Sequence, residues 1–244
     1  MIWVYVFAVI LLASLLKGIT GFGFALLSMP LLLFVYPVKF LIPVLTGFNL
    51  FTSILIVLSK KQKKQGLKAL ILPSWGILGL IPGVLFLHFQ SDRTLKIFAG
   101  IMLSLLAFAF LFGYRFKIRN PRRATMIAGL VSGFLNGSIS VGGPPLAFFL
   151  TSIKEDNEGF RMKFAWFSIA TASSALIGYY TAGLINNETF RMLLYMFPVL
   201  ITGTLVGKKV SRYIPVELFR KICILISLIS GIMVLIDMLF LRPR

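Results

Sequence analysis

The sequence contains few of the side chains that most enzymes use for catalysis or metal binding. Its 244 residues include one cysteine, Cys223, one histidine, His88, and only seven acidic residues. A single cysteine excludes an intrachain disulfide and a cysteine metal cluster. Asp237 is the only acid well inside an apolar run, so an intramembrane nucleophile with its base has too few candidates. We therefore predict no enzymatic activity, no metal site and no cofactor.

Charge is also scarce. Charged residues make up 13% of the chain and hydrophobic residues 58%, and the mean hydropathy is +0.95. This composition is too apolar for a soluble domain, so we expect the lipid bilayer to surround the chain. The net charge of +18 does not indicate a nucleic-acid partner, because Lys and Arg occur in short bursts without a continuous basic face. No cleaved signal peptide is predicted, because Lys17 follows the first apolar run rather than preceding it.

Long apolar runs divide the chain into spans and shorter pieces. Six runs approach the roughly 20 residues that a helix needs to cross a bilayer. They are 40–59, 69–88, 96–114, 164–183, 189–207 and 222–241. The remaining apolar pieces form two pairs around glycine-rich breaks, in 2–36 and 124–153. The arms of the second pair, about 12 and 10 residues, are too short to span, so each pair is predicted to be a re-entrant helical hairpin.

The basic residues predict an orientation. Five lie in 60–68 and five in 115–123, two segments separated by two spans. The positive-inside rule makes the face that they share cytoplasmic. With both hairpins returning to their starting face, this layout places 18 of the 25 basic residues inside and both termini outside.

The two halves of the chain resemble each other. A shift of 115 residues superimposes Gly18 on Gly133 and Pro30 on Pro145, and a shift of 124 superimposes "GLIPG" (79–83) on "GTLVG" (203–207). Each half, 1–118 and 119–244, is one hairpin followed by three spans, and an odd number of spans inverts the second half. We therefore predict an all-α polytopic membrane protein built from two inverted repeats. The GxxxG pairs suggest close helix packing, although glycine spacing can also recur by chance.

Two glycine-rich segments carry a resemblance to a known family. "KGITGFGFALLSMPLLLF" (17–34) and "SGFLNGSISVGGPPLAFFL" (132–150) each lead into a proline and an apolar run. With the two-half layout, they make the chain similar to the sulfite exporter TauE/SafE family of membrane permeases. The resemblance implies movement of sulfite, sulfonates or related anions across the bacterial cytoplasmic membrane. The first segment lacks the consecutive glycines common in that family, which leaves the substrate open.

The glycine-rich breaks are the predicted substrate site. Non-helical backbone inside a membrane must line a cavity or be buried in protein. The second arm of each hairpin begins at its break, so backbone N–H groups and a helix dipole would favour an anion there. The candidate substrate-binding residues are Lys17, Gly18, Thr20, Gly21, Gly23, Asn49, Asn136, Gly137, Ser138, Ser140, Gly142, Gly143 and Pro144.

Polar residues on the following spans extend this site. Thr46, Asn49 and Ser53 share one helical face, and Ser168, Thr171 and Ser174 share another. These hydroxyl groups could equally bond to their own backbone or to a neighbouring helix. Lys17 either faces the cavity or extends its ammonium toward water.

Together these features predict a secondary transporter. The expected function is export of a small sulfur-containing anion by alternating access around a site near the membrane midplane. An anion channel of the same fold and a non-transporting membrane assembly subunit are the alternatives. The sequence leaves the anion, the coupling ion and the oligomeric state open.

Overall fold

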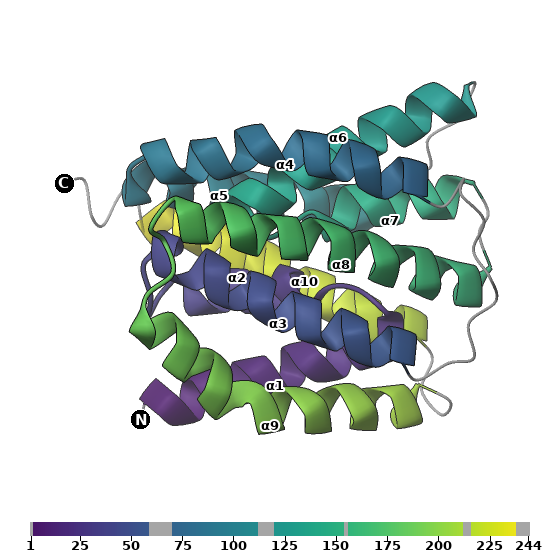
Figure 1. Ribbon diagram of the computed structural model, residues 1–244. Helices are drawn as coiled ribbons and strands as arrows, with labels where there is room; N and C mark the ends of the chain where they lie inside the picture. Colours follow the sequence, from purple (N-terminus) through teal and green to yellow (C-terminus); the bar gives the residue numbers. More distant parts are fainter. Residues whose placement is uncertain (1, 59–69, 112–119, 154–155, 212–215, 238–244) are drawn as a thin grey trace.

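The structure, a computed structural model, describes residues 2–58, 70–111, 120–153, 156–211 and 216–237. Within these segments the chain forms helices and short connections. The helices are α1 (Ile2–Thr20), α2 (Phe24–Leu32), α3 (Val38–Leu58), α4 (Ile71–Phe89), α5 (Asp92–Leu111), α6 (Pro121–Ile139), α7 (Gly143–Ser152), α8 (Asn157–Thr181), α9 (Asn187–Val210) and α10 (Val216–Ile236). The long helices lie side by side in a bundle, and α1 begins at the end where α10 finishes (Figure 1).

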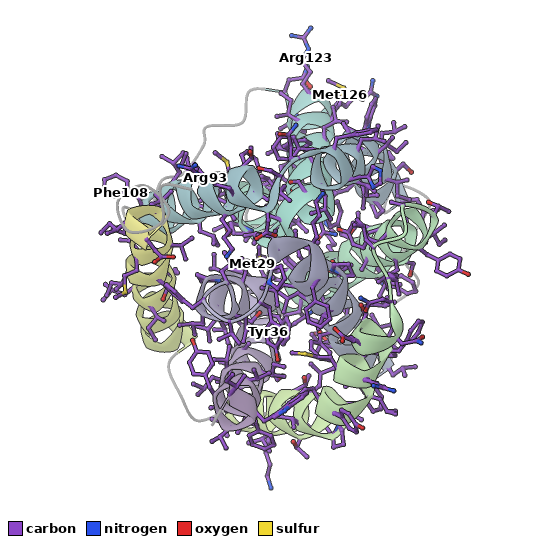
Figure 2. All side chains as sticks on the ribbon, turned by 90° about the vertical axis from the view of Figure 1, so that its left-hand side faces the viewer. Met29, Tyr36, Arg93, Phe108, Arg123 and Met126 are labelled. Atoms are coloured by element: carbon purple, nitrogen blue, oxygen red, sulfur yellow. The ribbon has the colours of Figure 1, made fainter. Side chains whose placement is uncertain are left out.

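Apolar side chains fill the bundle and also cover its outside. Viewed from the end at which α1 begins, Met29 lies in the middle of the bundle, whereas Phe108 and Arg123 lie on its periphery (Figure 2). Met29 is fully buried and Phe108 is 55% exposed. Large exposed apolar side chains occur on most of the long helices, a surface suited to lipid rather than water. The chain is accordingly a polytopic membrane protein.

Helix lengths agree with the membrane interpretation. In the described part of the chain, four helices are long and apolar enough to cross a bilayer: α1, α3, α4 and α9. The last three correspond to the predicted spans 40–59, 69–88 and 189–207. The other predicted spans overlap α5, α8 and α10, although α8 begins seven residues before 164.

The first arm of each hairpin is longer than predicted, whereas the second arm of the first hairpin, α2, ends at Leu32, before the predicted end at residue 36. The first arm of the second hairpin is α6, with 19 residues in place of the expected 12, so the argument that this arm is too short to span is wrong. The arm of the first hairpin, α1, also continues to Thr20. Both helices extend because small residues near their ends let them pack closely against a partner helix, which offsets the low helix propensity of glycine. The re-entrant path itself stays a prediction.

Glycines bring two helix pairs into backbone contact. A Cβ on Gly79 or Gly83 of α4 would collide with backbone oxygens of α6, and a Cβ on Gly203 or Gly207 of α9 would meet the backbone of α1. The prediction that both GxxxG pairs mediate close packing is therefore confirmed. In Figure 1, α4 runs along α6 and α1 runs along α9.

The remaining pairings follow a regular scheme. Besides α4 with α6 and α9 with α1, helix α3 packs against α8 and α5 against α10. Exchanging α1–α5 for α6–α10 in order converts the α4–α6 pair into the α9–α1 pair and leaves the α3–α8 and α5–α10 pairs unchanged. An inverted repeat with a pseudo-twofold axis would produce this scheme.

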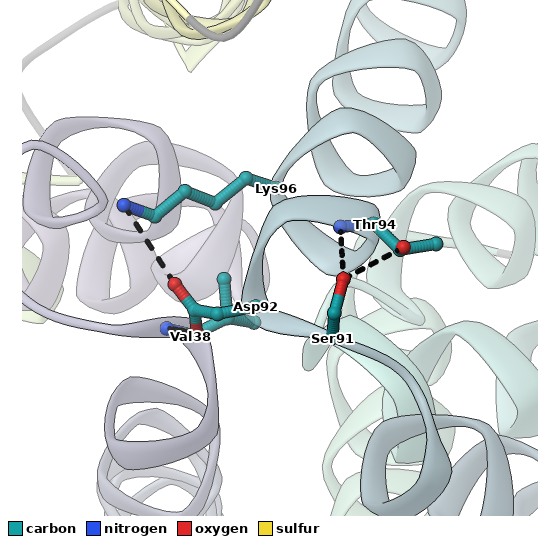
Figure 3. Close-up of polar contacts among 5 residues, drawn as sticks. All are labelled: Val38, Ser91, Asp92, Thr94 and Lys96. Carbon is teal, nitrogen blue, oxygen red and sulfur yellow. Dashed lines mark hydrogen bonds and ion pairs between the residues drawn. The ribbon is translucent and has the colours of Figure 1, made fainter. Parts of the chain in front are cut away.

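At the end of the bundle where α3 and α5 begin, a polar junction joins these two helices (Figure 3). Ser91 caps α5 by accepting a hydrogen bond from the Thr94 N–H at 3.1 Å. The Asp92 carboxylate accepts the Val38 N–H at 2.7 Å and lies 3.7 Å from the Lys96 ammonium. Asp92 therefore satisfies a free N–H of the first turn of α3.

The orientation of the bundle can be tested by cysteine labelling. In a Cys223→Ser background, Gln62→Cys in segment 60–68 should resist a membrane-impermeant thiol reagent in intact cells and react after the membrane is opened. The reason is the concentration of Lys and Arg on that face. Labelling of the new cysteine from outside intact cells would contradict the orientation. Asn187→Cys serves as the control. Asn187 begins α9, at the end away from its basic residues Lys208 and Lys209, so the new cysteine should react from outside.

Candidate functional site

Both helix breaks open onto one cavity, which we call the tip cavity. It lies between the start of α2, the end of α6, the start of α7 and the middle of α3 and α8. Seven of the predicted site residues line it: Gly23, Asn49, Asn136, Ser140, Gly142, Gly143 and Pro144. Ser168 and Thr171 of α8 also line it. About 20 Å³ is open to the centres of water molecules, enough for about one water.

The first break is a glycine turn. Gly21 and Gly23 have φ angles of 86° and 89°, which side chains other than glycine rarely adopt. Between them, the Phe22 N–H donates to Thr20 Oγ1 at 3.2 Å. Gly23 then caps α2, whose first backbone N–H groups have no partner within the helix. This turn places Gly23 and Phe24 at the tip cavity.

The second break is shorter than its glycine-rich sequence predicts. Asn136, Gly137 and Ser138, three of the predicted site residues, lie in the last turn of α6, and α7 begins at Gly143, so the break covers only 140–142. The helix ends at Ser140, whose φ is 58° and whose N–H donates to Asn136 O at 3.0 Å. Ser140 Oγ lies 3.1 Å from Thr46 Oγ1 on α3. Gly142 precedes α7, and prolines fill its first turn, where a missing N–H costs least.

The end of α6 is held by α8. The Asn136 Nδ2 donates to Thr171 Oγ1 at 3.1 Å. The Tyr179 hydroxyl donates to Gly137 O at 2.9 Å, and Tyr179 is fully buried. Tyr179 was not among the predicted site residues, because a single aromatic residue within an apolar span resembles any other core residue. Its hydrogen bond satisfies a carbonyl that the end of a helix leaves without a partner.

Lys17 is completely buried and does not line the tip cavity. Its Nζ donates to Asn49 O at 2.8 Å, to Ser53 Oγ at 2.8 Å and to Asn49 Oδ1. Lys17 therefore neither faces the tip cavity nor extends toward water, so both predicted alternatives are wrong. Asn49 stands between this ammonium and the tip cavity, so the charge lies behind the cavity wall.

Five other predicted site residues lie away from the tip cavity. Gly18 packs against the backbone of α9 at Gly207, and Gly137 packs against α4. Thr20 and Ser138 bond to the backbone of their own segments. Gly21 lies against the side chain of Arg161. These residues build the hairpins rather than the cavity wall, and Ser28 likewise donates only to Phe24 O.

Arg161 precedes the predicted span 164–183, but it belongs to α8 and contacts the end of α1. Its Nη2 donates to Ile19 O at 3.1 Å and also to Gly18 O. These carbonyls lie in the last turn of α1, where a positive charge also complements the helix dipole. A second cavity is lined by Gly18, Arg161, Thr204 and Lys208, together with apolar residues of α3 and α9.

The tip cavity combines donors with an absence of negative charge. Its polar lining consists of hydroxyl groups, two amides and the backbone of the two breaks, and no Asp, Glu, Lys or Arg lines it. Neutral donors around a small space suit an oxyanion. Within the segments that the structure describes, no group of three or more His, Cys, Asp or Glu could hold a metal ion.

The chain matches a known protein family. The profile of a family described as sulfite exporter TauE/SafE matches residues 6–234, which include both helix breaks and all residues lining the tip cavity. No curated protein and no solved structure matches the chain.

Proposed function

Because this chain belongs to the sulfite exporter TauE/SafE family, we propose that it carries a small sulfur-containing anion, such as sulfite or an organosulfonate, out of the cell. The transport proceeds by alternating access around the tip cavity, in the bacterial cytoplasmic membrane. The residues that contact the anion are those lining the cavity: Gly23, Asn49, Asn136, Ser140, Gly142, Gly143 and Pro144.

The observation that carries this proposal is the meeting of both helix breaks in one cavity. The two breaks are more than 100 residues apart in sequence, and each begins a helix whose N-terminal dipole favours an anion. In transporters with inverted repeats, discontinuous helices meet at the substrate site in this way. The pairing of α1–α5 with α6–α10 supports the same architecture.

The size of the tip cavity favours a carrier over a channel. In this conformation the tip cavity has room for about one water, which supports a closed form that must open to admit an oxyanion. A channel would have to keep a continuous path open, whereas a carrier alternates between closed and open forms. Flux into proteoliposomes should therefore saturate with substrate at low turnover. A rate that rises linearly with anion concentration would favour the channel, and no flux of any tested anion would favour an assembly subunit.

We expect the membrane potential to drive export without a coupled proton. Export of an anion from a cell whose interior is negative releases about 2.3 kcal/mol of free energy per charge per 100 mV. No carboxylate lines the tip cavity to carry a proton. Sulfite efflux from proteoliposomes should therefore accelerate when valinomycin and a potassium gradient make the interior negative. If a pH gradient drives efflux and the potential has no effect, the proposed energetics is wrong.

A further inference from the structure

Lys17 is the only charged side chain that is fully buried among the residues described. An ammonium has three N–H donors, and the three acceptors around Nζ match them: Asn49 O, Asn49 Oδ1 and Ser53 Oγ. With every donor occupied and no access to the tip cavity, Lys17 does not bind an anion directly. A buried charge with such a complete set of partners nevertheless calls for a role beyond packing.

The Asn49 side chain connects this charge to the cavity. Asn49 is half-buried and lines the tip cavity, and its Oδ1 accepts a hydrogen bond from Lys17. Within the described segments, Nδ2 of this amide has no acceptor. If the Asn49 amide were rotated by 180°, its two N–H donors would face the Lys17 ammonium, which is itself only a donor. The positive charge of Lys17 therefore disfavours that orientation. The lysine thus fixes which end of the amide meets the cavity.

Resting on the proposed function, we propose that Lys17 is a positioning residue that holds the Asn49 amide with its N–H groups toward the tip cavity, where they bind the substrate's oxygens. Two fixed donors favour a ligand that offers only acceptors at this position. The substrate class is therefore an oxyanion that is ionised where it meets Asn49. Neutral acids and cations are rejected, because they would set a donor or a positive charge against the amide.

The sharpest test is Asn49→Asp in the purified full-length protein, with sulfite as the probe. The substitution keeps the size of the side chain and still offers an oxygen to Lys17, so the contact that holds the helices survives. It replaces the amide donors with a carboxylate that faces the anion. Sulfite affinity should fall about 100-fold or more, while the thermal midpoint stays near that of the parent. A sulfite affinity within threefold of the parent would overturn the proposal.

A double-mutant cycle separates positioning from direct attraction. Lys17→Met removes the charge but keeps the length, and it should weaken sulfite binding about tenfold because the amide is released. In an Asn49→Ala background, the same substitution should change affinity by less than about threefold. Full additivity of the two effects would show that Lys17 acts on the anion without Asn49, and would refute the proposal. Ser14→Ala is the matched control, because its buried hydroxyl, on the same helix as Lys17, donates to Ile10 O and does not line the tip cavity.

Failure of this proposal and failure of the proposed function give different results. If the parent protein binds neither sulfite, thiosulfate nor small sulfonates, the proposed function is wrong and the inference that rests on it falls with it. If the parent binds sulfite and Asn49→Asp binds it equally well, the function stands and the positioning role of Lys17 is refuted.

Discussion

Gly143→Leu should abolish sulfite binding and transport while the protein still inserts into the membrane. Gly143 begins α7 and lines the tip cavity. A Cβ placed there would already lie 3.2 Å from Cζ of Phe164, another cavity residue, so a larger side chain has no room except the cavity itself. We expect loss of detectable flux in proteoliposomes at protein levels matched to the parent.

Gly143→Ala is the matched control for this substitution. Its single methyl group requires Phe164 to move by only a few tenths of an ångström, so binding should weaken far less than in Gly143→Leu. The Gly143→Leu variant should also keep the gel-filtration profile of the parent. Parental transport by Gly143→Leu would mean that the breaks are structural turns and that the anion passes elsewhere.

Gly133→Leu should prevent accumulation of folded protein, and Gly133→Ala should lower the thermal midpoint markedly. A Cβ on Gly133 would collide with Gly76 O and lie 3.0 Å from Gly76 Cα, so α4 and α6 would have to separate. Backbone cannot move aside as a side chain can, and overpacking of this kind costs about 1–3 kcal/mol or more. That cost exceeds the gain of about 1 kcal/mol in helix propensity from glycine to alanine.

Gly178→Ala provides the comparison within another helix. Gly178 lies in α8, where a Cβ would be 3.3 Å from Cγ1 of Val84, a side-chain atom. The gain in helix propensity should therefore leave the thermal midpoint unchanged or raised. The measurement is the midpoint of unfolding in detergent, followed by size-exclusion chromatography. Equal midpoints for Gly133→Ala and Gly178→Ala would contradict the tight α4–α6 contact.

Much of the helix order follows from local features of the sequence. Apolar runs of about 20 residues, two pairs of shorter arms and two glycine-rich breaks predicted the order of α1–α10. The positions of the breaks were less accurate, because glycine normally weakens a helix. In α1 and α6, Gly18 and Gly137 stay helical because each packs against the backbone of a neighbouring helix. That contact is not visible in a local pattern.

Local sequence features were sufficient to predict a helical membrane protein with two glycine-rich helix breaks and neutral polar residues near them. Hydropathy and the backbone preferences of glycine and proline act over a few residues, so they can be read from the chain alone. Only the tertiary structure decided that both breaks share one cavity, that Lys17 lies behind Asn49 and that Arg161 holds the end of α1. These features depend on contacts between distant segments, whose geometry is set by the packing of whole helices.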